Sequence, residues 1–209
     1  WCCPRTGTTL LEKLIKAPTT GQQASVLSPS DIDELGAIIQ TFHNYSLDLN
    51  EETSDGMSPM QLACHLGQTE FVRVLLESGE VRIDNCMQIA VNQMDVGVVR
   101  LLHDFGASVS EVGGEGKTLL HTLALADSAL PLPLPASLHA VHAQMGALLC
   151  RSHLVNMCDS FGKTALHYAS ATGKSGLVQF LLLDANADAD IPDANHMTPA
   201  ELATDQETR

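Results

Sequence analysis

The chain has 209 residues, and 44% of them are apolar, which excludes a disordered chain and allows a packed core. Only 4% are aromatic, so the core must be built from aliphatic side chains, as in closely packed helices. The formal net charge of −14 argues against direct nucleic-acid binding, because the surface repels phosphates. The same charge would attract a basic protein or peptide.

The chain shows no membrane span and no metal or disulfide pattern. Its longest apolar stretch, 124–138, is interrupted by three prolines and Asp127. The cysteines are irregularly spaced and form no C-x-x-C pair, which predicts free thiols, several of them buried, in the cytoplasm or nucleus. They are Cys2, Cys3, Cys64, Cys86, Cys150 and Cys158. The abrupt start and polar end of the sequence suggest a domain of a longer protein.

A helical unit recurs along the first half of the chain. The first copy, 4–50, is weak and is interrupted by a Ser/Thr/Gln/Pro-rich insertion at 18–29. The second copy, 53–84, is clear: it opens with Gly-Met-Ser-Pro-Met-Gln-Leu-Ala at 56–63 and continues into an apolar helical run. The third copy, 85–112, lacks this opening but keeps the second helix and the exit turn.

The second half repeats the same plan. The fourth copy, 113–158, contains an insertion at 127–137 that includes Pro-Leu-Pro-Leu-Pro. The fifth copy, 159–192, opens with Gly-Lys-Thr-Ala-Leu-His-Tyr-Ala at 162–169. A last copy, 193–204, stops after one helix. The last position of the opening motif recurs in steps of 49, 27, 34, 45 and 34 residues, and the long steps coincide with the two insertions.

The fifth copy resembles the ankyrin repeat over its whole length, with the G-x-T-P-L-H-x-A opening, a middle glycine, a V-x-x-L-L-L-like helix and a G-A-D-like exit. This resemblance implies one all-α domain, 1–209, that is a solenoid of stacked antiparallel helix pairs with hairpin loops. We count about five repeats and a half-repeat cap. Each pair can bury its apolar stripe only against its neighbours.

The start of the first helix in each unit carries a predicted cap. Ser or Thr stands at the N-cap position of five units. These residues are Thr9, Ser58, Thr118, Thr164 and Thr198. Pro59 and Pro199 follow at the first helical position, where a missing N–H costs nothing. The resemblance implies that His121 and His167 are structural and form hydrogen bonds between repeats.

No group of residues indicates catalysis, and we expect no enzyme activity, cofactor or metal. Cys64 and His65 are adjacent on a helix, so they point about 100° apart and cannot act as a nucleophile–base pair. His139 and His142 could share a helix face but lack a third ligand, and a surface pair is expected. The glycine-rich segment 113–118 lacks the spacing of a phosphate-binding loop.

The predicted function is binding of a protein or peptide partner by a monomeric scaffold. The resemblance implies a concave face formed by hairpin tips and first helices, and eight tip positions are candidates. They are Asp55, Met57, Glu115, Lys117, Phe161, Lys163, Asn195 and Met197. Phe161 is either a partner anchor or packs on a neighbouring hairpin.

Three alternatives remain open at this point. The first is a regulatory domain of a larger enzyme or transcriptional regulator. The second is an acidic reader of basic peptides such as histone tails. The third concerns an insertion. The proline-rich insertion at 127–137 is either a polyproline II ligand or a stiff loop.

Overall fold

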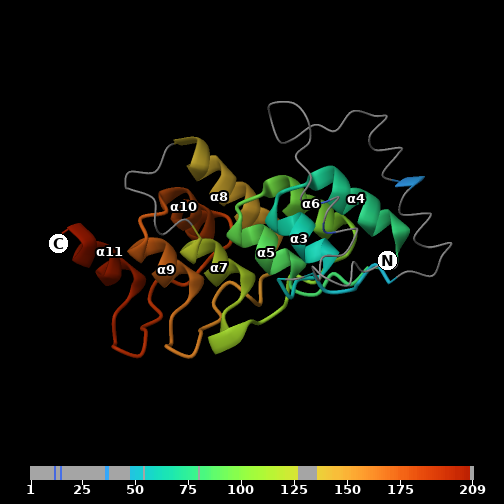
Figure 1. Cartoon of the computed structure of the whole chain (residues 1–209). Coiled ribbons are helices and arrows are strands. Elements are labelled where there is room, and N and C mark those ends of the chain that lie inside the picture. The colour runs from blue at the N-terminus through green and yellow to red at the C-terminus, as the bar shows by residue number, and fades with distance from the viewer. Residues whose placement is uncertain are drawn as a thin grey trace. The chain divides into compact units, whose positions relative to one another are not determined.

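The computed structural model describes residues 12, 15, 36, 37, 48–53, 55–79, 81–126 and 136–207 (Figure 1). The chain divides into two compact units, residues 1–90 and residues 91–209, and each is described by itself. The described residues are helical apart from turns and an isolated β-bridge between Val112 and Thr118. This agrees with the predicted all-α fold.

In the first unit, α3 (Pro59–His65) packs against α4 (Thr69–Ser78). Ser58 caps α3 as predicted, since its Oγ accepts from the N–H of Gln61 at 3.2 Å and its own N–H donates to Gln61 Oε1 at 3.0 Å. Gly79 follows α4 as its C-cap, and its left-handed φ of 71° suits glycine. The unit boundary falls inside α5 (Cys86–Asn92).

The second unit contains two rows of stacked helices. The first row is formed by α7 (Leu119–Leu125), α9 (Ala165–Ala171) and α11 (Pro199–Glu207), which Figure 1 shows side by side. The second row is formed by α6 (Val96–Asp104), α8 (Ala136–Leu149) and α10 (Ser175–Leu183). The rows also pack on each other, α7 on α8 and α9 on α10. Each helix pair therefore buries its apolar stripe against the next pair, as predicted.

Two glycines allow α8 and α10 to approach closely. A Cβ at Gly146 would lie 2.7 Å from the ring of Phe180, and a Cβ at Gly176 would overlap the backbone of His139. Leu177 and Leu181 are fully buried beside this contact. Backbone therefore faces a side chain at Gly146 and faces backbone at Gly176, and larger residues at these two glycines would separate the helices.

Some sequence-based expectations need correction. The predicted insertion 127–137 is too long by two residues, because α8 begins at Ala136. His142 is not a surface residue, since it is fully buried on α8. Cys64 and Cys86 are buried as predicted, but Cys158 is exposed. The four described cysteines form no disulfide.

Other expectations lie outside the described residues. Among them are the insertion 18–29, residues 127–135, Cys2, Cys3 and the cap at Thr9. Of the first copy, residues 12, 15, 36, 37 and 48–50 are described, and Glu12 and Ile15 are helical and buried.

Candidate partner-binding surface

A hairpin loop precedes each of the helices α3, α7, α9 and α11, and a backbone hydrogen bond closes each loop. The N–H of its first residue donates to the carbonyl oxygen four residues later. The pairs are Thr53–Met57 and Gly113–Lys117 at 2.8 Å, and Asp159–Lys163 and Asp193–Met197 at 2.9 Å. Because the loops share this geometry, the eight candidate residues occupy two equivalent positions.

The first of these positions is the hairpin tip. It holds Asp55, Glu115, Phe161 and Asn195, and all four are exposed. The second position leads into the helix. It holds Met57, Lys117, Lys163 and Met197, and all four are half-buried. Between the two positions stands a residue with left-handed φ. It is Gly56, Gly116, Gly162 or His196.

The three hairpins of the second unit are joined to one another through their backbones. The N–H of Ser160 donates to the carbonyl oxygen of Glu115 at 2.8 Å, and the N–H of Ala194 donates to that of Phe161 at 3.0 Å. Glu115, Phe161 and Asn195 therefore lie on consecutive, linked tips. Asp55 and Met57 belong to a hairpin of the unit formed by residues 1–90.

Phe161 combines a fixed backbone with an exposed ring. Its N–H donates to Asp159 Oδ1 at 2.9 Å, and its carbonyl oxygen accepts from the next hairpin. The residue is nevertheless 49% exposed. Exposing a large apolar side chain to water costs free energy. A partner that covers the ring would recover this free energy.

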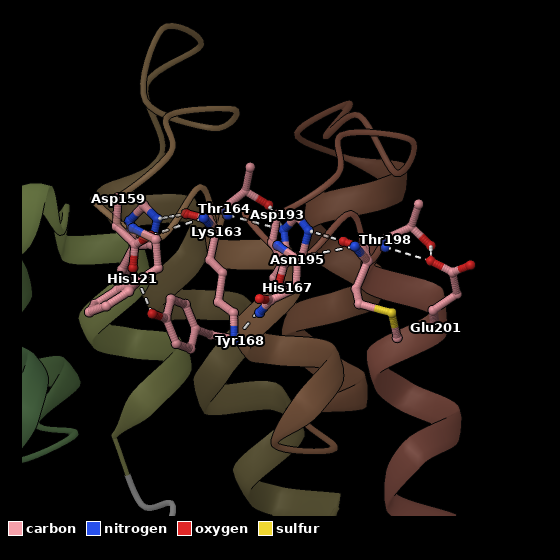
Figure 2. A network of polar contacts seen from close by, with 12 residues as sticks. His121, Asp159, Lys163, Thr164, His167, Tyr168, Asp193, Asn195, Thr198 and Glu201 are labelled. Carbon is pink, nitrogen blue, oxygen red and sulfur yellow. Dashed lines mark hydrogen bonds and ion pairs between the residues drawn. The ribbon is translucent and has the colours of Figure 1, made fainter.

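Behind the tips lies a polar network that the sequence analysis missed (Figure 2). The hydroxyl of Tyr168 donates to Asp159 Oδ2 at 2.6 Å. The ammonium groups of Lys117 and Lys163 lie 5.8 and 5.5 Å from the centre of the Tyr168 ring. Lys117 also pairs with Glu115 at 2.8 Å.

Burial and hydrogen bonding shift two pKa values in this network. Burial alone would raise the pKa of Asp159, but hydrogen bonds from Tyr168, Lys163 and Phe161 outweigh it and hold the pKa below its usual value. Burial and the Asp159 carboxylate raise the pKa of Tyr168. At neutral pH the pair is therefore a carboxylate that accepts from a neutral phenol.

The two signature histidines connect consecutive repeats, which confirms their predicted structural role. His121 Nδ1 accepts from the N–H of Thr118 at 3.1 Å, so Nε2 carries the hydrogen and donates to the carbonyl oxygen of Lys163 at 3.0 Å. His167 makes the same two contacts with Thr164, at 3.0 Å, and Met197, at 3.2 Å. Burial lowers the pKa of both rings.

The other residues weighed for chemistry in the sequence can now be placed in the structure. Cys64 is buried while its neighbour His65 is exposed, as expected for adjacent positions on α3. Residues 113–118 form a hairpin with a short 3₁₀ turn, η1 (Gly114–Gly116). Within the part of the chain that the structure describes, no group of three His, Cys, Asp or Glu could hold a metal ion. No described helix is long and apolar enough to cross a membrane.

Comparison with known proteins identifies the repeat. The family model described as Ankyrin repeat matches residues 55–88 and 161–194. These two matches overlap most of the second and fifth copies, 53–84 and 159–192, which are the clearest in the sequence.

Solved structures share the fold. A chain in the structure of the Bd0816 predatory endopeptidase from Bdellovibrio bacteriovorus in complex with immunity protein Bd3460 is 20% identical, with a TM-score of 0.63, and the match covers 88% of this chain and 94% of that one. The ankyrin repeat domain of Bcl-3, a member of the IkappaB protein family, is 21% identical with a TM-score of 0.65, and the match covers 82% and 74%. The predicted ankyrin-repeat fold is thus confirmed.

Proposed function

The chain belongs to the ankyrin-repeat family, and we propose that it is a non-catalytic module that binds a protein or peptide through its hairpin surface. In the second unit this surface consists of three exposed tips and the residues behind them. They are Glu115, Phe161, Asn195, Lys117, Lys163 and Met197. The hairpin of Asp55 and Met57 would supply the same kind of contact in the first unit.

The single observation that carries this proposal is the exposed ring of Phe161 on a hydrogen-bonded tip. A ring that serves the core would be buried between helices, as Phe71 and Phe180 are. Because the backbone of Phe161 is already fixed, little conformational entropy is lost when a partner covers the side chain. Rigid aromatic residues of this kind are frequent binding hot spots.

The complex in which the first of the two solved structures was determined, of an endopeptidase with an immunity protein, also supports a protein partner. The net charge of −14 favours a basic one, because opposite charges accelerate encounter and disfavour acidic competitors. Reading of basic peptides is therefore the second candidate, and it uses the same surface. Salt dependence separates the two, since binding of a basic peptide weakens as ionic strength rises.

The test compares two phenylalanines of similar exposure. The purified chain and its Phe161→Ala and Phe105→Ala variants are used for affinity capture from lysate with quantitative mass spectrometry. Phe105 is 45% exposed and is the C-cap residue of α6, outside the hairpin segments 113–117, 159–163 and 193–197. The proposal expects specific partners to be lost with Phe161→Ala, by about 1 to 3 kcal/mol of binding free energy, and retained with Phe105→Ala. Equal capture by both variants would refute it.

A further inference from the structure

Asp193 has one carboxylate oxygen that finds no hydrogen-bond donor. Its Oδ1 accepts from the N–H groups of Asn195 at 2.8 Å and Met197 at 3.0 Å, which shapes the last hairpin. Its Oδ2 is buried and has no hydrogen-bond partner. A buried carboxylate oxygen without a hydrogen-bond donor is costly in a folded protein and needs an explanation.

The preceding hairpin shows what is missing. Asp159 occupies the same place, and its Oδ1 accepts from Phe161 and Lys163 in the same way. There, however, Oδ2 receives the hydroxyl of Tyr168, nine residues further on. Nine residues after Asp193 stands Leu202, which has no donor. The last hairpin therefore keeps the acceptor, Asp193 Oδ2, but has no hydroxyl at position 202 to donate to it.

Lys163 is the nearest positive charge to this oxygen, but it does not bind it closely. Its ammonium lies 3.9 Å from Asp193 Oδ2, beyond hydrogen-bond distance, and 5.5 Å from the centre of the Tyr168 ring. Figure 2 shows the Lys163 side chain between these two residues. The Lys163 side chain is 27% exposed and that of Asp193 is 1% exposed, so a cation from outside can reach Oδ2 only if Lys163 turns toward Tyr168.

The carboxylate stays ionised in this setting. Burial alone would raise the pKa of Asp193, but the N–H groups of Met197 and Asn195, and then the charge of Lys163, lower it. The group that completes Oδ2 must therefore donate hydrogen bonds to a negative charge. An ammonium or guanidinium group forms the strongest such bonds.

We infer that Asp193 is a specificity-determining subsite that accepts a basic side chain, arginine or lysine, from the bound partner. The partner's cation displaces Lys163 toward Tyr168 and donates to Oδ2. The subsite adjoins Phe161, because the Phe161 carbonyl oxygen accepts from Ala194 in the hairpin of Asp193. This inference rests on the proposed function and adds the chemistry of one residue in the partner.

The test supplies Asp193 Oδ2 with a hydrogen-bond donor from the chain itself, as Tyr168 does for Asp159 in the neighbouring repeat. Leu202→Tyr supplies a phenol at the position equivalent to Tyr168, and Leu202→Phe supplies the ring without the hydroxyl. A random peptide library displayed on phage is selected on the purified chain. An enriched peptide and its variant with the basic residue replaced by glutamine are then measured by calorimetry against each protein.

The expected pattern is a coupling between residue 202 and the basic residue of the peptide. Glutamine weakens binding by about tenfold or more to the parent chain and to Leu202→Phe, and by much less to Leu202→Tyr. Leu202→Tyr also melts at a higher temperature than Leu202→Phe. Enriched peptides without a basic residue, or an equal glutamine effect on all three proteins, would overturn the inference.

Two further variants keep the test decisive. Lys163→Met removes the competing ammonium but not the Lys163 carbonyl, and it should tighten binding of the basic peptide several-fold. Weaker binding to Lys163→Met would contradict the inference even if Leu202→Tyr fails to fold. Phe161→Ala tests the proposed function separately: if it leaves peptide binding unchanged, the hairpin surface itself is wrong.

Discussion

His121 Nε2 lies 3.0 Å from the carbonyl oxygen of Lys163 in the next repeat, and Gln61 Nε2 lies at the same distance from the carbonyl oxygen of Asp84. Both side chains also accept from the N-cap N–H of their own helix, Thr118 or Ser58. Histidine and glutamine are thus two solutions to one task, capping a helix and connecting it to its successor.

This equivalence predicts the outcome of two substitutions at one position. His121→Gln should be tolerated, because the amide can both accept and donate as Gln61 does. His121→Ala should destabilise by about 2 to 4 kcal/mol, because it leaves buried groups of Thr118 and Lys163 unpaired. Urea unfolding of the three proteins measures the difference. Equal losses for Gln and Ala would mean that the ring matters through packing alone.

The buried ring of His142 predicts a loss of stability in mild acid. Neither ring nitrogen has a hydrogen-bond partner, and burial, with further contributions from the nearby charges of Lys174 and His139, lowers the pKa to about 4. The unfolded pKa is near 6.5, so the unfolded chain binds the proton first, and stability falls as pH drops from 6.5 to 4. The full effect is on the order of 3 kcal/mol.

The control for this prediction is His142→Leu, which fills the site without a titratable group. Its unfolding free energy should be higher at neutral pH and should fall less between pH 6.5 and 4. The lowered pKa values of His121 and His167 act in the same direction and leave a residual slope. The pKa values of Asp159 and Asp193 are also lowered, and the stability that these two carboxylates contribute is lost only when the pH falls below this range. Identical pH profiles for parent and variant would rule out His142 as the source.

The helical fold was predictable because short stretches of sequence mark where each helix starts and which face it buries. The start of α3 is marked by Ser58 with Gln61 and by Pro59, and the buried face of α4 is marked by its apolar spacing. Stacking of the units follows because the same apolar stripe recurs in each unit. The first-position tips could also be located, since each is fixed by the same turn. α8 was harder, because His142 lies in a helix with apolar residues all round, and periodicity then assigns no exposed face.

The polar network behind the tips was not predictable from one repeat. Tyr168 stands at a variable position of the opening motif. Its contacts are with Asp159 in its own hairpin and with lysines from two hairpins. The missing hydrogen-bond donor at Asp193 Oδ2 becomes visible only when the two hairpins are compared in space. The signal in the sequence is the pair of spacings, Asp159 to Tyr168 and Asp193 to Leu202.

The core of the second row predicts unequal effects of two neighbouring leucines. Leu181 is fully buried on α10, whereas Leu183 is 69% exposed. Leu181→Ala should destabilise by about 2 to 4 kcal/mol through the cavity that it leaves. Leu183→Ala should change stability by less than about 0.5 kcal/mol. Similar losses in thermal and urea unfolding would show that the face of α10 is wrongly assigned.

The last prediction separates two costs at the hairpin turns. Gly116 and Gly162 both have left-handed φ, 74° and 72°, so alanine at either position costs about 1 kcal/mol from the backbone alone. At Gly116 an added Cβ would meet backbone atoms at an ordinary 3.6 Å. At Gly162 it would lie 2.9 Å from the backbone nitrogen of Ala194, which donates to Phe161. Gly162→Ala should therefore destabilise clearly more than Gly116→Ala.

The same variant tests whether linked tips matter for binding. Gly162→Ala pushes the last hairpin away from Phe161, so it should weaken capture of partners beyond what its loss of stability explains. Binding is measured well below the melting temperature of each variant, with Gly116→Ala as the reference for the shared backbone cost. If both variants lose the same unfolding free energy and bind partners alike, the hairpins adjust independently, and the hydrogen bond between Ala194 and Phe161 does not hold the surface together.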